Sequence, residues 1–217
     1  MTAERMAFGH LTIGFDERLL RPRPWTAAQS QWAAELIAQA PDGPVLELCA
    51  GAGHIGLLAI ALEPRPLVCV DVNPAASDHI LANAEAAGVG ALVEVRTARL
   101  EEALDDTERF AVVIADPPWV RRADVGRFPE DPLLAIDGGD DGLELARACV
   151  DVAAAHLLPG GSALLQLGTA EQARLIELAL PDSLRLLEVR TFERGVVARL
   201  GRGSQFGAVA NGISRRI

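Results

Sequence analysis

The chain has 217 residues, of which 50% are hydrophobic and 23% are charged, and a formal net charge of −10. This length and apolar content predict one globular domain and exclude a disordered chain. The acidic charge disfavours non-specific binding to phosphate backbones. Three widely spaced cysteines predict neither a disulfide framework nor a metal site. Because no secretion signal and no apolar run of about 20 residues is found, we expect a cytoplasmic protein that does not bind membranes.

Strand-like and helical segments alternate along most of the chain. A helix is expected first, with Thr26 as its N-cap. Apolar runs then predict five strands, which suit a parallel sheet covered on both faces because they do not alternate with polar residues. The expected strands are residues 45–49, 67–71, 92–96, 111–115 and 163–167, and the expected helices are 26–39, 55–62, 75–87, 143–158 and 170–179.

The C-terminal part departs from this alternation. Residues 184–192 and 196–200 are two strand-like runs joined by three residues, which predicts an antiparallel hairpin. Residues 159–161, Pro-Gly-Gly, are expected to end the long helix and to turn the chain into the next strand, residues 163–167. The whole order predicts an α/β fold with a doubly wound sheet that is mostly parallel.

A glycine-rich turn joins the first expected parallel strand to its helix. Gly51, Gly53 and Gly56 allow a ligand to approach the main chain, and Asp71 follows Gly51 by 20 residues, where a carboxylate can accept ribose hydroxyls. This pattern suits a dinucleotide as well as S-adenosylmethionine. Glu47 lies inside the strand, where a carboxylate is costly without a partner. An ammonium group would be such a partner, and the length leaves no room for a second substrate domain, so S-adenosylmethionine is favoured.

The strand that ends near residue 115 is followed by Asp116, Pro117, Pro118 and Trp119. In an open α/β sheet, a residue in this position faces the ligand cleft. The two prolines hold the loop rigid and lack N–H donors, so the Pro117 carbonyl is available to a substrate. A carboxylate and a carbonyl together suit an –NH2 group, and Trp119 offers a flat wall to a planar amide or base. The tetrapeptide therefore predicts chemistry on an amide or amino nitrogen.

In this order, the motifs resemble those of the class I S-adenosylmethionine-dependent methyltransferases, and among these the HemK-type glutamine N5-methyltransferases. Residues 19–26 are similar to the N-terminal Pro-Arg-Pro-x-Thr motif of that family, and residues 47–53 to its glycine motif. Asp71 resembles its ribose-binding acid, and residues 116–119 stand where the family has Asn-Pro-Pro-Tyr. Residues 127–143 resemble the segment that follows. The resemblance runs from about residue 15 to residue 201.

The resemblance implies a Rossmann-like, seven-stranded sheet and methyl transfer from S-adenosylmethionine. Residues 1–40 would pack on the cofactor cleft, residues 41–202 would form the catalytic domain, and residues 203–217 would be a tail. The catalytic residues are then expected among Asp116, Pro117, Pro118 and Trp119. The cofactor-binding residues implied are Thr26, Glu47, Cys49, Ala50, Gly51, Gly53, Asp71, Val72, Leu100 and Asp116.

Three departures from that family bear on the substrate. Only about forty residues precede the first parallel strand, so we expect the family's helical N-terminal domain to be absent. Asp116 replaces an asparagine, and a carboxylate cannot donate to a glutamine carbonyl. Arg99 stands where an acid is expected near the adenine, which leaves adenine recognition to the backbone around Leu100.

The acceptor therefore stays open between a protein glutamine and the amino group of a nucleobase or small metabolite. Duplex DNA is disfavoured by the acidic charge. A cofactor-binding module without catalysis, and a dehydrogenase, are more remote alternatives. Arg121, Arg122 and Arg127 form a local basic patch that is a candidate contact for an anionic group.

Overall fold

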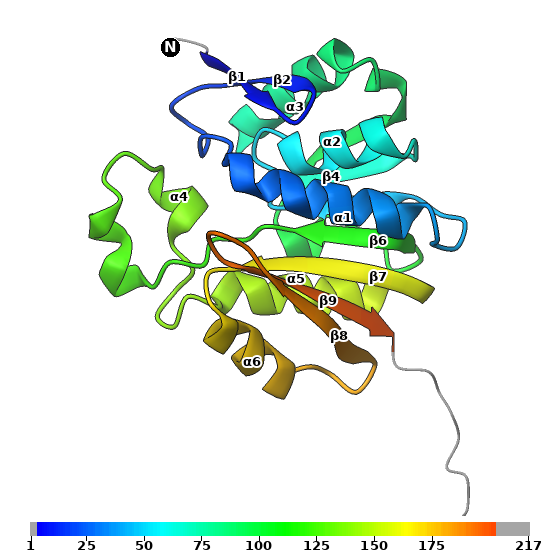
Figure 1. Cartoon of the computed structure of the whole chain (residues 1–217), viewed down its shortest axis with the longest axis vertical. Helices are drawn as coiled ribbons and strands as arrows, with labels where there is room; N and C mark the ends of the chain where they lie inside the picture. The colour runs from blue at the N-terminus through cyan, green and yellow to red at the C-terminus, as the bar shows by residue number, and fades with distance from the viewer. Residues whose placement is uncertain (1–3, 203–217) are drawn as a thin grey trace, which may run out of the picture.

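The computed structural model describes residues 4–202, so the expected tail lies outside the described residues. Its main sheet has seven strands in the order β5-β4-β3-β6-β7-β9-β8 (Figure 1). The first five are parallel, whereas β9 pairs antiparallel with both β7 and β8. The strands are β3 (Val45–Leu48), β4 (Leu67–Asp71), β5 (Val93–Thr97), β6 (Phe110–Ala115), β7 (Leu157–Leu167), β8 (Leu184–Thr191) and β9 (Val196–Arg202). The predicted α/β fold and C-terminal hairpin are confirmed.

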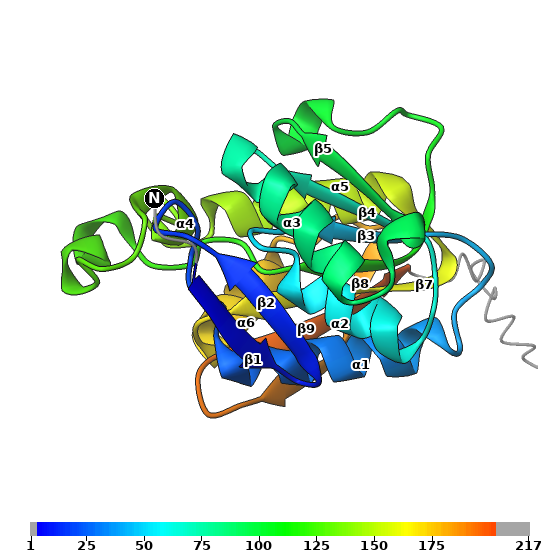
Figure 2. The same cartoon turned by 90° about the horizontal axis from the view of Figure 1, so that it is seen from above.

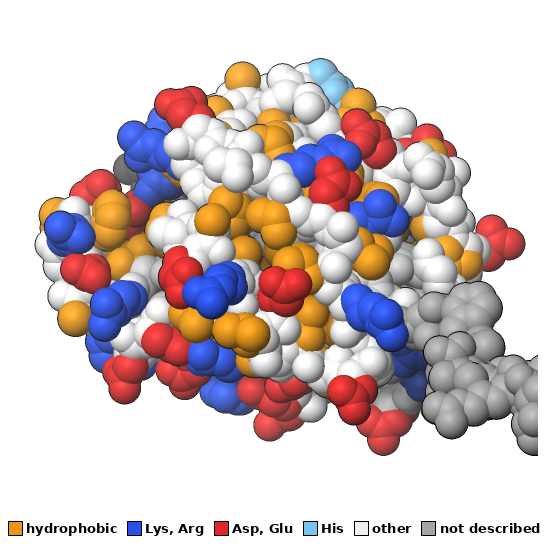
Figure 3. All heavy atoms as spheres, turned by 60° about the horizontal axis from the view of Figure 1, so that its bottom comes forward, with side chains coloured by type: hydrophobic (Ala, Val, Ile, Leu, Met, Phe, Trp, Pro, Cys, Tyr) orange, Lys and Arg blue, Asp and Glu red, His pale blue; other side chains and the backbone are white. Residues whose placement is uncertain are grey.

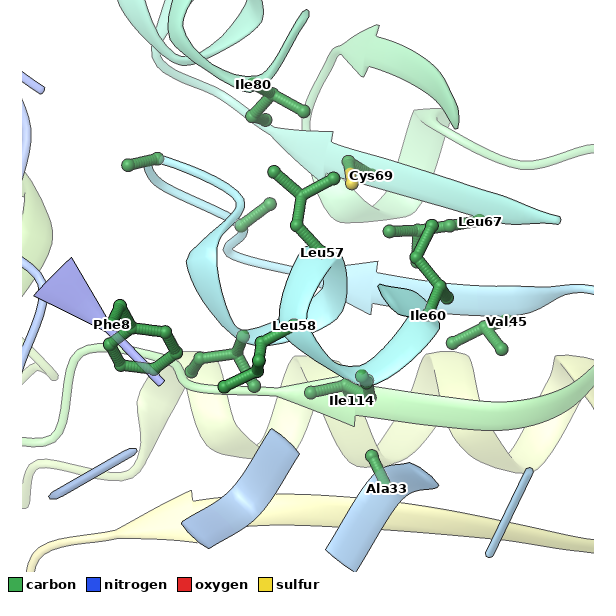
Figure 4. Close-up of a cluster of buried hydrophobic side chains, with 14 of the residues drawn as sticks. Phe8, Ala33, Val45, Leu57, Leu58, Ile60, Leu67, Cys69, Ile80 and Ile114 are labelled. Atoms are coloured by element: carbon green, nitrogen blue, oxygen red, sulfur yellow. The ribbon is translucent and has the colours of Figure 1, made fainter. Parts of the chain in front are cut away.

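Helices cover both faces of this sheet (Figures 1 and 2). On one face, α1, α2 and α3 bury apolar side chains against the sheet, and on the other face α5 and α6 do so. In Figure 4, Leu57 and Ile60 of α2 lie beside Leu67 and Ile114 of the sheet. Burial on both faces explains why the strands are apolar throughout. The helices are α1 (Ala27–Ile37), α2 (His54–Leu62), α3 (Pro74–Ala86), α4 (Leu133–Ile136), α5 (Glu144–His156) and α6 (Ala170–Leu178).

An N-terminal hairpin was not predicted from the sequence. β1 (Glu4–Phe8) and β2 (Leu11–Phe15) pair antiparallel and pack against α3. The Asn83 amide of α3 donates to the Gly14 carbonyl at 2.9 Å and accepts from the Gly14 N–H at 2.7 Å. The alternation of buried and more exposed residues along β2 is typical of a strand and was the signal available.

Two local predictions were wrong. Thr26 precedes α1 but does not cap it, because its hydroxyl donates to the Arg23 carbonyl at 2.8 Å at the end of the 3-10 turn Pro24–Thr26. Residues 159–161 do not separate a helix from a strand. The helix α5 ends at His156 and β7 begins at once, so the Pro-Gly-Gly segment lies within β7, where its pairing with β6 shifts register.

Among the helices described for residues 4–202, none has the length and apolar character that crossing a bilayer requires.

The central strand β6 provides a test of the buried core. Ile114 is fully buried, so Ile114→Ala is expected to lower the free energy of unfolding by about 2–5 kcal/mol, measured by urea denaturation. The control is Leu178→Ala on α6, where the side chain is 74% exposed and a change within about 0.5 kcal/mol is expected. Equal losses in the two variants would contradict this assignment of the core.

Candidate functional site

A cavity of about 250 Å³ lies at the carboxyl ends of the parallel strands. The segments that follow β3, β4, β5 and β6 all contribute to its wall, as is typical of ligand sites in open α/β sheets. Its lining includes Arg18, Leu19, Leu20, Cys49, Ala50, Gly51, His54, Asp71, Val72, Asn73, Arg99, Leu100, Glu101, Asp116, Pro118, Leu134 and Leu145.

The glycine loop uses its amide donors inside the protein. The N–H of Gly51 donates to Asp71 Oδ2 at 2.7 Å, and the N–H of Gly56 donates to Glu47 Oε1 at 2.9 Å. The N–H of Gly53 donates to the Ala50 carbonyl at 2.7 Å. A dinucleotide pyrophosphate needs free amide donors at such a loop. The three glycine N–H groups of the fingerprint are thus satisfied within the protein.

Glu47 lies beneath this loop and does not line the cavity. Its carboxyl is fully buried, accepts from the Gly56 N–H and contacts Cys69 Sγ at 3.5 Å. Burial raises the pKa of Glu47 to about 7. A side chain at position 56 would collide with this carboxyl, which explains the glycine there. The structure thus gives Glu47 the task of holding the loop rather than the ligand contact that the sequence suggested.

Asp71 faces the cavity from the end of β4. Its Oδ2 accepts from the Gly51 N–H and its Oδ1 accepts from the Asn73 N–H at 2.8 Å, so two backbone bonds fix its direction. Burial raises its pKa. Each carboxylate oxygen keeps a second lone pair, which can accept from a hydroxyl of a ligand. The neighbouring Val72, which is exposed, lines the same part of the wall.

Asp116 faces the cavity from the end of β6. Within residues 4–202, no group donates a hydrogen bond to its carboxyl, and burial raises its pKa to about 7. Asp116 is half-buried, and a carboxyl withdrawn from water without a protein partner favours a ligand that donates to it. The position therefore suits an N–H group of a bound molecule.

Of the other three residues of the tetrapeptide, only Pro118 lines the cavity. Pro117 is buried and Pro118 lines the cavity. Trp119 does not line it, because its ring lies against Gly168 at the end of β7, and its carbonyl accepts from Gln172 Nε2 at 3.0 Å. A methyl group at position 168 would overlap that ring. The Trp119 side chain, which was expected to form a wall of the site, is thus half-buried beside the cavity.

The other residues predicted to bind the cofactor are placed as follows. Cys49, Ala50 and Leu100 line the cavity, and Cys49 adopts a positive φ of 56°. Gly53 and Thr26 do not line it. Thr26 instead lies behind His54, with its Oγ1 3.5 Å from His54 Nε2. Burial lowers the pKa of His54 to about 4, which keeps its ring neutral.

Several cavity residues were missed by sequence reasoning. The segment after β2 contributes Arg18, Leu19 and Leu20 to the wall. Arg18 donates to Asp16, and the Arg18 guanidinium holds the pKa of that carboxyl well below its usual range. The ionised Asp16 Oδ2 also accepts from His79 Nε2 at 2.9 Å. No motif marked this segment, because its place over the cavity depends on the unpredicted hairpin.

The opposite side of the wall carries a second acid that was missed. Glu101 lines the cavity two residues after Arg99 and pairs with it at 3.5 Å. Within the described range, no group of His, Cys, Asp and Glu side chains is arranged to hold a metal ion.

Comparison with known proteins identifies the relatives of the chain. A family model described as conserved hypothetical protein 95 matches residues 21–128. The release factor glutamine methyltransferase of Clostridium acetobutylicum is 25% identical over 194 residues, which cover 86% of this chain and 68% of that protein. That of Cereibacter sphaeroides is 33% identical over 169 residues, which cover 74% of this chain and 59% of that protein. The chain is similar in sequence to the release factor glutamine methyltransferases over most of its length.

This homology confirms the resemblance drawn from the motifs. The fold is likewise that of a methyltransferase, since the crystal structure of a ribosomal protein L11 methylase from Lactobacillus delbrueckii subsp. bulgaricus superposes with a TM-score of 0.59. That structure is 17% identical, and the match covers 85% of this chain and 81% of the other. The chain spans roughly six tenths to two thirds of the length of the two glutamine methyltransferases.

The raised pKa of Asp116 predicts a pH-dependent stability difference. Between about pH 4 and about pH 7, the native state keeps a proton on Asp116 that the unfolded state has released. The free energy of unfolding therefore falls as the pH rises through this range. Asp116→Asn removes this titration. As the pH rises through the same range, the free energy of unfolding of the variant should therefore increase relative to that of the parent, by at most about 1.4 kcal/mol per pH unit. Urea unfolding at a series of pH values measures the difference.

Glu47 titrates in both proteins, and the raised pKa of Glu47 comes mainly from its burial and only to a lesser extent from the Asp116 charge, so most of its contribution cancels in the comparison. The exposed Glu130→Gln is the matched control and should show no such trend. A stability difference between Asp116→Asn and its parent that is constant with pH would contradict the buried placement of this carboxyl.

Proposed function

We propose that the chain is an S-adenosylmethionine-dependent N-methyltransferase that acts on the amide nitrogen of a protein glutamine. One observation carries the proposal: Asp71 and Asp116 face a single cavity beside the glycine loop, and Asp116 has no hydrogen-bond donor among the described residues. The homology to glutamine methyltransferases supports the acceptor.

The charge of the cavity supports the cofactor. S-adenosylmethionine carries a sulfonium and an ammonium group against one carboxylate, so it is a net cation. The wall contributes Asp71 and, above its pKa of about 7, Asp116, whereas the two arginines that line it, Arg18 and Arg99, are paired with acids. A net negative wall attracts a cation and repels the two phosphates of a dinucleotide. Asp71 would hold the ribose, and Cys49, Ala50, Gly51 and Leu100 would contact the rest of the molecule.

The residues of the chain then orient the acceptor. The cofactor supplies an activated methyl group, so the protein needs mainly to place the nitrogen in line with it. Asp116 Oδ accepts one N–H of the substrate, and the Pro117 carbonyl accepts the other. As positive charge develops on the nitrogen, the Asp116 carboxylate stabilises it and receives the proton that the methylated nitrogen loses.

The carboxyl at position 116 also favours a second candidate, an exocyclic amino group of a nucleobase. Such a group has two protons to donate and no need of a donor in return, which suits a carboxylate better than a carboxamide. Transfer of labelled methyl groups from the cofactor into separated protein, RNA and small-molecule pools distinguishes the two. Label in glutamine of the protein pool is expected, and label confined to RNA would reject the glutamine assignment.

Substitution of the two acids should separate binding from turnover. Asp71→Asn is expected to weaken S-adenosylmethionine binding by at least about tenfold in calorimetry, because the side chain loses its charge and keeps one acceptor oxygen instead of two. Asp116→Ala should keep the affinity within about threefold but lower turnover by ~100-fold or more at saturating cofactor.

Asp151→Asn on the exposed face of α5 is the control for both measurements. Undiminished cofactor binding by Asp71→Asn would remove Asp71 from the site. Full turnover by Asp116→Ala would remove Asp116 from the reaction.

Gly168 gives an independent test of Trp119. In Gly168→Ala the new methyl group overlaps the Trp119 ring, which must move, so we expect kcat/KM for the acceptor to fall by about tenfold with unchanged cofactor affinity. The control is Gly126→Ala, where the added methyl group meets nothing within 4 Å. If both variants keep the parent kcat/KM, the Trp119 ring takes no part in placing the acceptor.

A further inference from the structure

The segment that follows Trp119 projects from the body of the molecule beside the cavity. We call residues 121–141 the rim segment; it contains the 3-10 helix Arg122–Arg127 and α4, and it extends away from the sheet in Figures 1 and 2. Leu134 of this segment also lines the cavity. Whatever binds the rim segment therefore lies next to the proposed reaction.

Large apolar side chains of the rim segment are exposed. Leu133 is 59% exposed, Leu134 is 60% exposed and Phe128 is 36% exposed. Val72, across the cavity wall, is exposed as well. Single exposed apolar residues are common, but several grouped at the mouth of a cavity are typical of a site for a partner. The rim segment thus presents apolar area that the described chain does not cover.

The charge of the rim segment selects the kind of partner. Six acidic and three basic residues lie within it. Arg122 bonds to Asp137 and Asp140, and Arg127 pairs with Asp124, so the charges within these groups largely cancel. Arg23 pairs with Asp131 and Arg147 pairs with Asp141, which leaves Glu130 as the acid of the segment that has no ion pair among the described residues. Of the basic patch that the sequence suggested, Arg122 and Arg127 are therefore not free to bind an anion. An acidic surface repels phosphate backbones and attracts basic groups.

Basic and acidic side chains lie side by side with apolar ones at the left edge of Figure 3, where this segment projects. Glu130 is exposed and makes no ion pair among the described residues. It is thus available to a cationic group of a partner.

The rim segment is held in one position before any partner arrives. Arg23 Nη2 donates to Asp131 Oδ1 at 2.7 Å, and the Asp131 side chain is nearly buried. At the base of the segment, the N–H of Val120 donates to the Ile136 carbonyl at 3.1 Å and the N–H of Gly138 donates to the Val120 carbonyl at 2.8 Å. A surface that is already ordered loses less entropy on binding.

We propose that the rim segment is the docking surface for the protein substrate, and that the docked part of that substrate carries both apolar and basic side chains. This inference rests on the proposed function, because it takes the acceptor to be a protein. Apolar side chains of the partner would pack on Phe128 and Leu133, and its cations would face Glu130. RNA is disfavoured at this surface by the same charges.

Three synthetic peptides with one central glutamine test the proposal. Their flanking residues are lysine with leucine, lysine with serine, or glutamate with leucine, and an RNA hairpin serves as a competitor. Binding is measured by fluorescence anisotropy, methyl transfer with labelled cofactor gives kcat and KM, and calorimetry measures the affinity for S-adenosylmethionine. The variants are the double substitution Phe128→Ser/Leu133→Ser and the single Glu130→Lys. Leu178→Ser, which changes an exposed leucine on α6, is the matched control.

The lysine–leucine peptide should bind most tightly. The double substitution should weaken its binding and raise its KM by about tenfold, with kcat and cofactor affinity unchanged. Glu130→Lys should weaken the lysine–leucine peptide and improve the glutamate–leucine peptide. Leu178→Ser should behave as the parent does.

Equal binding by the double variant and the control would overturn the proposal, as would displacement of the peptide by the RNA hairpin at equal concentration. Anisotropy reports docking without turnover. A chain that binds the lysine–leucine peptide through Phe128 and Leu133 but methylates no glutamine keeps the docking surface and refutes the proposed function.

Discussion

Two buried carboxyls that hold the glycine loop determine the character of the whole site. Asp71 and Glu47 accept the N–H groups of Gly51 and Gly56, so the loop is fastened to the sheet by acids instead of waiting for a phosphate. This arrangement satisfies the N–H groups of the three fingerprint glycines inside the protein. It also leaves the cavity wall negative, because Asp71 and Asp116 face it while its arginines are paired. A cationic, methyl-donating ligand satisfies those charges, whereas a pyrophosphate does not.

The order of strands and helices could be predicted because burial on both faces leaves a plain mark in the sequence. Runs such as those around Ile114 are apolar without alternation, and the positions of the parallel strands follow from them. The hairpin β1–β2 was harder to predict, because its strands are short and its position depends on hydrogen bonds from β2 to Asn83, which is distant in the sequence. The end of α5 was misplaced for a related reason. Pro159 and Gly160 are typical of a turn, but a register shift in the sheet accommodates them within β7.

Within the site, residue types were easier to predict than directions. Glu47 and Asp71 are both acids at the carboxyl ends of neighbouring strands, yet Glu47 points under the loop and Asp71 points into the cavity. No spacing rule distinguishes them, because Glu47 lies opposite Cys69, two residues before Asp71, so both side chains are on the same face of the sheet. They differ in depth, since Glu47 lies inside its strand and Asp71 is the last residue of its own. The same limit applies to Trp119, whose ring rests on Gly168, about fifty residues later in the chain. The same limit applies to the arginines of the rim segment, because the sequence alone does not show which acidic residues they pair with.

The central claim is that this cavity is built for a cationic sulfonium cofactor and not for a dinucleotide. Calorimetric titration of the unmodified chain with S-adenosylmethionine, and separately with NAD, tests it most directly. The structure predicts one site per chain for S-adenosylmethionine and no measurable binding of NAD under the same conditions. Saturable binding of NAD, or no heat with S-adenosylmethionine, would contradict the account.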